Sequence, residues 1–228
     1  MDKKRFGFSL AEVLITLGVL GIVAAMTIPM MKESYEKKSI IPSLKKAYSN
    51  LRQAFIASQD INAEFDTWNF NLNAEDFYEK YMKGYHNAER VVKVSDLASH
   101  GVAYYNMDGT AITEPAIAND DSVVVILPDG VMLFVSEEAN NNYKALAIDV
   151  NGLKRPNIVG KDIFMVAVQK QFGLMPYGYA DGGSVSFGRS FDNETLLNST
   201  PYGCAHSGAY CTAYIMSNSW SMSKNYPR

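Results

Sequence analysis

Apolar and polar residues are distributed very unevenly near the start of the chain. Residues 8–31 read FSLAEVLITLGVLGIVAAMTIPMM and contain a single charged side chain, that of Glu12. A helix rises about 1.5 Å per residue, so roughly 20 such residues cross the ~30 Å apolar core of a bilayer. The pattern therefore predicts one membrane-spanning helix close to the N-terminus.

The next segment, residues 32–60, has the periodicity of an amphipathic helix. Its apolar residues recur at spacings of three and four: Ile41, Leu44, Tyr48, Leu51 and Phe55. This spacing puts them on one face, so we expect the second half of a long helix to pack on a globular head. Pro42 predicts a kink or break in it, or a restart with Pro42 in the first turn. Pro29 predicts a kink or local melting.

Runs of β-forming residues predict a small antiparallel sheet further along the chain. The four strand candidates are residues 122–127, 131–135, 144–150 and 162–168. The sequence Pro128-Asp129-Gly130 separates the first two and is typical of a hairpin turn. We therefore expect an α+β fold in which three or four strands have their apolar face covered by the long helix.

Shorter elements complete the expected head, residues 61–228. The aromatic stripe of residues 74–84 predicts a short helix that contributes to the core. Residues 173–208 are rich in Gly, Ser, Asn and Pro, which predicts an extended surface loop with a short capped helix at 192–197. Residues 211–220 fit a helix or a strand equally well.

Composition and motifs exclude several classes of function. The chain has 228 residues and a net charge of −3, with no basic cluster beyond residues 3–5, so we expect no nucleic-acid partner. The sequence has no Gly-x-Ser-x-Gly, His-Glu-x-x-His, Walker A or Gly-x-Gly-x-x-Gly pattern. His86, His100 and His206 are isolated and are expected to be exposed. We expect a non-enzymatic protein with no catalytic residues and no cofactor.

The charges around the apolar run decide between kinds of membrane segment. The basic residues 3–5 precede it, so the positive-inside rule puts the N-terminus in the cytoplasm and the head outside. A cleaved secretory signal has a shorter apolar core, and a simple signal anchor is the other competitor. Neither explains Glu12, because a carboxylate inside the span costs about 2.5–3.5 kcal/mol on insertion scales. The alternative is that Glu12 lies near the membrane edge and snorkels out.

The segment Gly7-Phe8-Ser9-Leu10-Ala11-Glu12 and its apolar continuation resemble the cleavage and methylation motif of type IV prepilins and type II secretion pseudopilins. In that family a short basic leader ends in Gly, Phe follows, and Glu stands four residues after the Phe. Pro29 lies where many of these helices carry a proline. The resemblance implies cleavage between Gly7 and Phe8 and N-methylation of the new Phe8 amine.

The resemblance also implies an organisation and a set of partners. Residues 1–7 would be a cytoplasmic leader, 8–31 the transmembrane and assembly helix, 32–60 its amphipathic continuation, and 61–228 the extracytoplasmic head. The expected partners are the prepilin peptidase, other pilin or pseudopilin subunits, an assembly platform protein and the bacterial inner membrane, which the chain would cross once before entering a filament. Pilin heads have the same α+β layering as the one expected here.

Glu12 has a specific role in this interpretation. Cleavage gives Phe8 a positive amine, which can neutralise Glu12 of a neighbouring subunit when helices pack side by side. The pairing is strong in a medium of low dielectric, where an uncompensated carboxylate is costly. We therefore expect Phe8, Glu12 and Pro29 to take part in assembly.

Two features of the head carry further expectations. The stretch from Asp149 to Phe164 resembles a recurring pattern in heads of this family, Asp-x-Asn-Gly, Pro-Asn, Gly-x-Asp-x-Phe, and indicates a structural turn. Some major pseudopilins bind calcium in a head loop, and Asp149, Asn151 and Asp162 are suitable oxygen donors, although their spacing matches no EF-hand.

Cys204 and Cys211 lie in the segment expected outside the cytoplasm and predict one disulfide that fixes the C-terminal loop. Reduced thiols would fit only an intracellular chain.

The sequence thus favours a structural subunit of a type II secretion pseudopilus or a type IV pilus, polymerising through its N-terminal helix. Whether it is a major or a minor subunit stays open. The alternative is a signal-anchored extracytoplasmic binding or enzymatic domain that keeps residues 1–7 and does not polymerise. Gly7-Phe8 with Glu12 discriminates between them, because an ordinary anchor has no reason to carry that combination.

Overall fold

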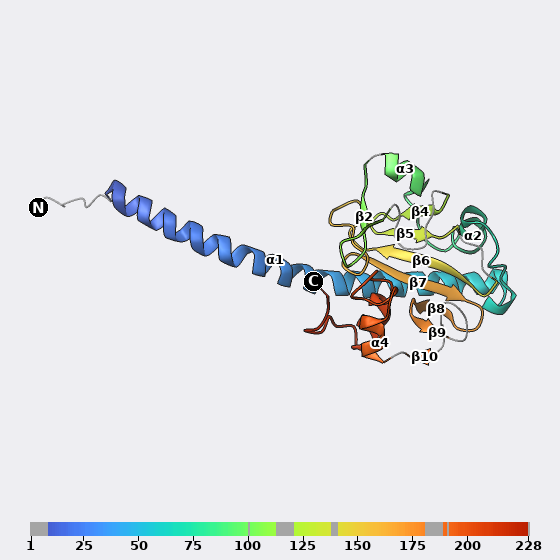
Figure 1. Cartoon of the computed structure of the whole chain (residues 1–228). Helices are drawn as coiled ribbons and strands as arrows, with labels where there is room; N and C mark the ends of the chain where they lie inside the picture. The colour runs from blue at the N-terminus through green and yellow to red at the C-terminus, as the bar shows by residue number, and fades with distance from the viewer. Residues whose placement is uncertain are drawn as a thin grey trace, which may run out of the picture. The chain divides into compact units, whose positions relative to one another are not determined.

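The computed structural model describes residues 9–99, 101–112, 121–137, 141–180, 189–190 and 192–227. The chain divides into two compact units, Met1–Ser39 and Ile40–Arg228. Helix α1 (Leu10–Asn62) runs through the boundary between them, and all other elements belong to the second unit (Figure 1).

The described part of the first unit is the first half of α1, which begins with an apolar segment up to Ile28. The large apolar side chains of Leu10–Ile28 are exposed between 41% at Val13 and 79% at Leu10, and none of them is buried against protein. The segment Leu10–Ile28 has the length and composition needed to cross a membrane. A helix that is apolar on all sides is stable in lipid, so this segment is the transmembrane segment that the sequence predicts.

Helix α1 continues through both of its prolines. Its bounds, Leu10 and Asn62, enclose Pro29 and Pro42 without interruption, so local melting at Pro29 and a break or restart at Pro42 are wrong. The other alternative at both prolines, a kink, stays a prediction. A proline removes only one hydrogen bond from the helix interior. Beyond Pro42 the burial of Leu44 and Leu51 against the head offsets that loss.

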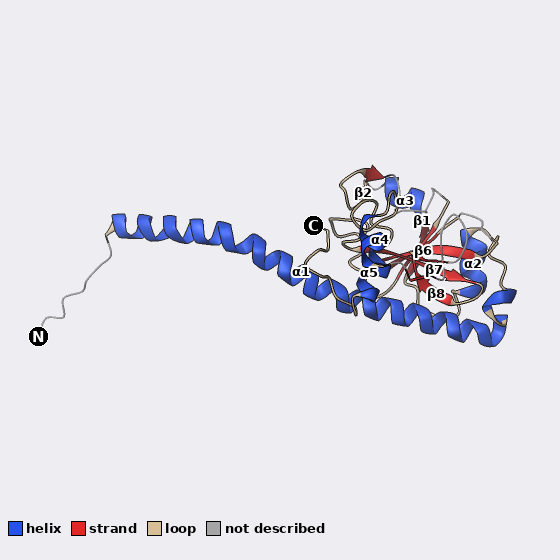
Figure 2. Ribbon diagram, turned by 60° about the horizontal axis from the view of Figure 1, so that its bottom comes forward, coloured by secondary structure: helices blue, strands red, loops and turns tan. Residues whose placement is uncertain are grey.

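The second unit is built on a six-stranded antiparallel sheet in the order β1-β4-β5-β6-β7-β8. Its strands are β1 (Arg90–Lys93), β4 (Val123–Ile126), β5 (Met132–Val135), β6 (Tyr143–Asp149), β7 (Ile163–Gln169) and β8 (Gly173–Pro176). The second half of α1 lies along one face of this sheet (Figure 2). Every residue of β6 and β7 is buried, so both faces of the central strands are covered.

The four predicted strands are confirmed as β4 to β7, and the sheet is larger than expected. The two additional strands are the edges, β1 and β8. Smaller pairs are β2 (Tyr104–Tyr105) with β3 (Ala111–Ile112), and β9 (Tyr179–Ala180) with β10 (Arg189–Ser190). The segment 173–208 is therefore not simply an extended loop, because it contains β8, β9, β10 and the helix α4 (Asn193–Asn198).

Aromatic side chains fix the end of α1 to the head. Trp68, just after the short helix η1 (Phe65–Thr67), stacks on Tyr81 with ring centroids 4.2 Å apart. Phe55 of α1 and Phe77 of α2 (Ala74–Tyr81) contact the same indole, whose Nε1 donates to the carbonyl oxygen of Ala63. The aromatic stripe predicted on residues 74–84 is thus part of the core, although the helix itself ends at Tyr81. A further short helix is α3 (Val94–Ser99).

The predicted disulfide is confirmed between Cys204 and Cys211, both of which are fully buried. Cys211 is the first residue of α5 (Cys211–Ser217), so the C-terminal segment that fitted either a helix or a strand is a helix. The bridge joins the start of α5 to the chain that follows α4. It therefore holds the C-terminal part of the head in place.

We expect removal of this bridge to destabilise the head. In the chain-entropy model, a loop of so few residues contributes about 2–3 kcal/mol. The double variant Cys204→Ala/Cys211→Ala should lower the free energy of unfolding of the detergent-solubilised chain by about that amount, measured by denaturant titration. Dithiothreitol should destabilise the wild type and leave the double variant unchanged. Equal stability of the two oxidised proteins would contradict the prediction.

Candidate functional site

The first candidate site is the beginning of α1. Gly7 and Phe8 lie outside the described residues. Ser9 and Glu12 form a reciprocal pair: Glu12 Oε2 accepts from the Ser9 backbone N–H and from Ser9 Oγ, both at 2.9 Å. Ser9 Oγ in turn accepts from the Glu12 backbone N–H at 3.3 Å. This is a capping box, which satisfies backbone donors that a helix start leaves open.

The capping box gives Glu12 a local role that the sequence analysis missed. The signal for it, Ser-x-x-Glu before an apolar run, is present at residues 9–12. Glu12 is exposed, and the two hydrogen bonds that it accepts from Ser9 within the described chain both use Oε2. Oε1 therefore stays open to a second donor. Pro29 lies inside α1, and its side chain is not among those described.

The second candidate site is the turn between β6 and β7. Asp149 Oδ1 accepts from the backbone N–H groups of Asn151, at 3.0 Å, and Gly152, at 2.8 Å. Asp162 Oδ2 accepts from the Asn157 backbone at 2.7 Å and from Asn151 Nδ2 at 3.1 Å, and its Oδ1 accepts from the Ile158 backbone at 2.6 Å. Asn151 thus links the two carboxyl groups, and the three expected oxygen donors lie together.

These hydrogen bonds support the interpretation as a structural turn. Gly152 has a φ of +66°, and a Cβ there would lie 2.3 Å from the carbonyl oxygen of Gly130, so only glycine fits. Three of the four carboxyl oxygens already accept N–H donors, which a calcium ion would have to displace. Among the described residues no group of three or more His, Cys, Asp or Glu side chains is arranged to hold a metal ion. The calcium site therefore stays a prediction of the sequence alone.

The electrostatics of this turn are unusual because both carboxyl groups are buried. Burial, with the neighbouring charge of Asp162, raises the pKa of Asp149 well above its ordinary value. Burial also raises the pKa of Asp162, although N–H donors such as that of Ile158 oppose the shift. Asp149 Oδ2 and the Tyr104 hydroxyl are buried without a hydrogen-bond partner in the described part of the head. A neutral Asp149 suits these surroundings better than a carboxylate.

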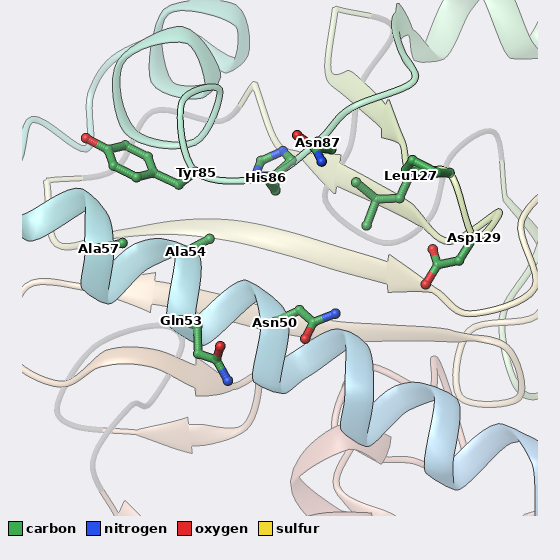
Figure 3. A pocket seen from close by; sticks show the side chains of 10 residues that line it. Asn50, Gln53, Ala54, Ala57, Tyr85, His86, Asn87, Leu127 and Asp129 are labelled. Atoms are coloured by element: carbon green, nitrogen blue, oxygen red, sulfur yellow. The ribbon is translucent and has the colours of Figure 1, made fainter.

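The third candidate is a cleft beside the second half of α1. It encloses about 560 Å³ and is lined by Asn50, Gln53, Ala54, Ala57, Tyr85, His86, Asn87, Leu127, Pro128 and Asp129. In Figure 3, α1 forms one side, the segment 85–87 lies opposite, and Leu127 and Asp129 lie at one end. The lining offers amide groups and an imidazole but no serine, threonine or cysteine. The lining also includes the Tyr85 phenol and the Asp129 carboxylate, so the cleft can donate and accept hydrogen bonds.

Two histidines differ from the expectation that they are exposed. His86 is half-buried, and neither ring nitrogen has a hydrogen-bond partner within the described residues. Burial lowers its pKa, so the imidazole is neutral at pH 7. His206 is also half-buried, with Nε2 3.2 Å from the carbonyl oxygen of Asn198. The sequence could not indicate the burial of His86, because that burial results from the packing of the segment 85–87 near α1. His100 lies outside the described residues.

The buried acid pair predicts a specific dependence of stability on pH. A carboxyl group whose pKa is raised by folding contributes stability below its unfolded pKa, near 4, and loses it as the pH rises through the folded pKa. Asp149→Asn keeps the Oδ1 acceptor and removes the charge. We expect the variant to be about 1–2 kcal/mol more stable than the wild type at pH 7.5, with a smaller difference at pH 5.

Denaturant titration of the full chain in detergent at several pH values would test this. Asp66→Asn is the matched control, because Asp66 is exposed. It should change the stability little at any pH. A wild type that is at least as stable as Asp149→Asn at pH 7.5 would show that Asp149 is stabilised as a carboxylate, contrary to the prediction.

Comparisons with known proteins match two parts of the chain to family models. The model of a prokaryotic N-terminal methylation motif matches residues 2–28, and this motif is typical of structural subunits rather than of enzymes. It supports a type IV pilin- or pseudopilin-like role that includes processing by a prepilin peptidase, assembly with pilin subunits and membrane anchoring. Neither the curated proteins nor the solved structures gave a match.

A second model, described as a family of unknown function (DUF6613), matches residues 30–228, which is most of the chain. It covers the whole head and the second half of α1. The methylation motif ends at residue 28, two residues before this match begins. The chain therefore belongs to the DUF6613 family, and its N-terminal segment carries the methylation motif that supports a pilin- or pseudopilin-like role.

Proposed function

We propose that this protein is a structural subunit of a type II secretion pseudopilus or a type IV pilus. In this proposal it is cleaved after Gly7, N-methylated at Phe8, and polymerised through its N-terminal helix by way of an assembly platform protein. It starts as a single-pass protein of the bacterial inner membrane, with its N-terminus in the cytoplasm and its head outside. The observation that carries the proposal is the methylation motif, whose match at residues 2–28 includes the apolar helical segment Leu10–Ile28.

The hydrogen bonding of the Glu12 carboxylate leaves room for a second role beyond the capping box. Ser9 occupies only Oε2, so the other oxygen can accept from the amine of a neighbouring Phe8 while the cap stays intact. In lipid an unpaired charge is costly, and a pair of opposite charges is far less so. Subunits that pack with Phe8 beside Glu12 are therefore favoured over subunits packed in another register.

The rival function is a signal-anchored binding domain that does not polymerise. The cleft beside His86 is the observation in its favour, because its volume is in the range of ligand sites. This rival has no use for the methylation motif, and it predicts that residues 1–7 remain on the chain. The two functions therefore differ in the N-terminus of the mature protein.

The first test is the intact mass of the protein purified from membranes of its host. We expect a mature chain that begins with N-methylated Phe8 and contains the Cys204–Cys211 bridge. The same chain from a strain without prepilin peptidase should keep residues 1–7 and serve as the control. A chain that keeps Met1 in the presence of active peptidase would support the rival function.

The second test separates the two roles of Glu12. Glu12→Gln and Glu12→Leu both remove the charge, whereas Ser9→Ala removes only the capping partner. If Glu12 pairs with the Phe8 amine, both Glu12 variants should be cleaved but should yield at least about tenfold fewer filaments, since the lost pair is worth more than ~1.4 kcal/mol. Ser9→Ala should assemble nearly as well as the wild type.

The yield is measured by shearing cells that produce the assembly machinery and quantifying the sedimented subunit. Immunoblots of the membrane fraction confirm equal amounts of processed protein. Loss of assembly in Ser9→Ala equal to that in Glu12→Gln would mean that helix capping, and not charge pairing, is what assembly requires.

A further inference from the structure

A groove runs between the second half of α1 and the edge strand β8. It encloses about 500 Å³ and is lined by Lys45, Tyr48, Ser49, Arg52, Phe172, Leu174, Met175, Pro176, Met216 and Trp220. Thioether, aliphatic and aromatic groups make up most of its surface. Phe172 is 45% exposed at its border. A groove of this kind on a surface in water indicates a site for a partner.

The charges of this groove are all positive. Lys45 and Arg52 are exposed, lie about two turns apart on α1, and belong to the same flank of the helix. Neither forms an ion pair within the described residues. The Lys45 ammonium instead lies 6.0 Å from the centre of the Trp220 ring. The groove therefore fits an apolar group that is accompanied by carboxylates.

The other end of α1 has the complementary composition. Ile61 is 79% exposed, as much as Leu10 in the transmembrane segment, although it belongs to the head. Asp60 precedes it, and Glu64 and Asp66 follow shortly after, all of them exposed. The last turn of α1 contains no basic residue. This acidic end, residues 60–66, thus presents one large apolar side chain among three carboxyl groups.

The groove and Ile61 lie on opposite flanks of the same helix. At 3.6 residues per turn, Ile61 projects roughly 160° around the axis from Lys45. It also lies about 18 Å further along the axis than Ser49, at the middle of the groove. Two heads that face the same way and are shifted along α1 by about that distance can therefore bring Ile61 of one to the groove of the other.

We propose that the groove between α1 and β8 holds the acidic end of α1 from a second copy of this chain. Ile61 of that copy enters the apolar part, and its Asp60 meets Lys45 and Arg52. This inference rests on the proposed function, because a filament built from chains of one membrane orientation makes neighbouring heads face the same way. The groove and the acidic end are different surfaces, so the contact is heterologous and does not close on itself. Each head can bind one copy through its groove and another through its acidic end.

Cysteine crosslinking of the full chain in membranes of a host with the assembly machinery tests this contact. Two differently tagged copies are produced together, one with Ser49→Cys and one with Ile61→Cys. The native cysteines are already paired, so they do not compete. We expect a crosslinked dimer that contains both tags. In the matched control Asn50→Cys replaces Ser49→Cys, which moves the thiol about 100° around α1. The control should give about tenfold less of the mixed dimer.

Charge reversal tests whether the groove recognises the carboxylates. Arg52→Glu in the copy with Ser49→Cys should lower the yield of mixed dimer about tenfold, because like charges then face each other. Asp60→Arg in the copy with Ile61→Cys should restore it. Both side chains are exposed, so neither change disturbs the core. A yield that is insensitive to both reversals would overturn the role given to the charges.

The outcome distinguishes this inference from the proposed function. Mass spectrometry of the same membranes shows whether the chain begins at methyl-Phe8. A processed chain that sediments as filaments, with no more 49–61 than 50–61 crosslinking, overturns the proposed contact and leaves the proposed function standing. An unprocessed chain that gives no crosslinks between copies overturns both.

Discussion

The burial of the second half of α1 against the sheet is the constraint on which the rest of the head depends. Leu44, Leu51 and Phe55 lie on one side of the helix and are almost completely buried. They cover a sheet whose central strands have no exposed residue, so neither the helix nor the sheet could exist in water alone. The Lys46–Asp129 ion pair and the aromatic cluster around Trp68 fix the helix at two further points.

The burial of one side of α1 explains why the helix continues through Pro42. It also leaves the two flanks beside the buried side free to differ from each other. Because the buried side holds α1 in place, the flanks are free to have other compositions. One flank borders a cleft rich in amide groups, with a neutral imidazole, and the other borders an apolar groove with two cations. The same helix therefore has three surfaces with distinct chemistry, and only one of them is needed for the fold.

The elements that the sequence predicted well are those with a strong local signal. The apolar run, the helical periodicity around Leu51 and the Pro128-Asp129-Gly130 hairpin each depend on neighbouring residues, and each matches the structure. The edge strand β8 was missed because it lies in a stretch of turn-forming residues and owes its conformation to pairing with β7. Lys144 is a similar case. A lysine near the start of a strand indicates an exposed side chain, but Lys144, the second residue of β6, is fully buried and donates to the carbonyl oxygen of Leu72.

The capping box bears on the order of two events, the formation of helix α1 and the cleavage of the chain. Its hydrogen bonds involve only Ser9 and Glu12, both of which lie on the retained side of the Gly7–Phe8 bond. Proteolysis there would alter the charge and covalent end of the polypeptide while leaving the bonds that begin the helix unchanged. The positive pole of the helix dipole would gain a second positive charge, with the Glu12 carboxylate beside it. Maturation of this protein would then be an electrostatic change made to a helix that is already formed.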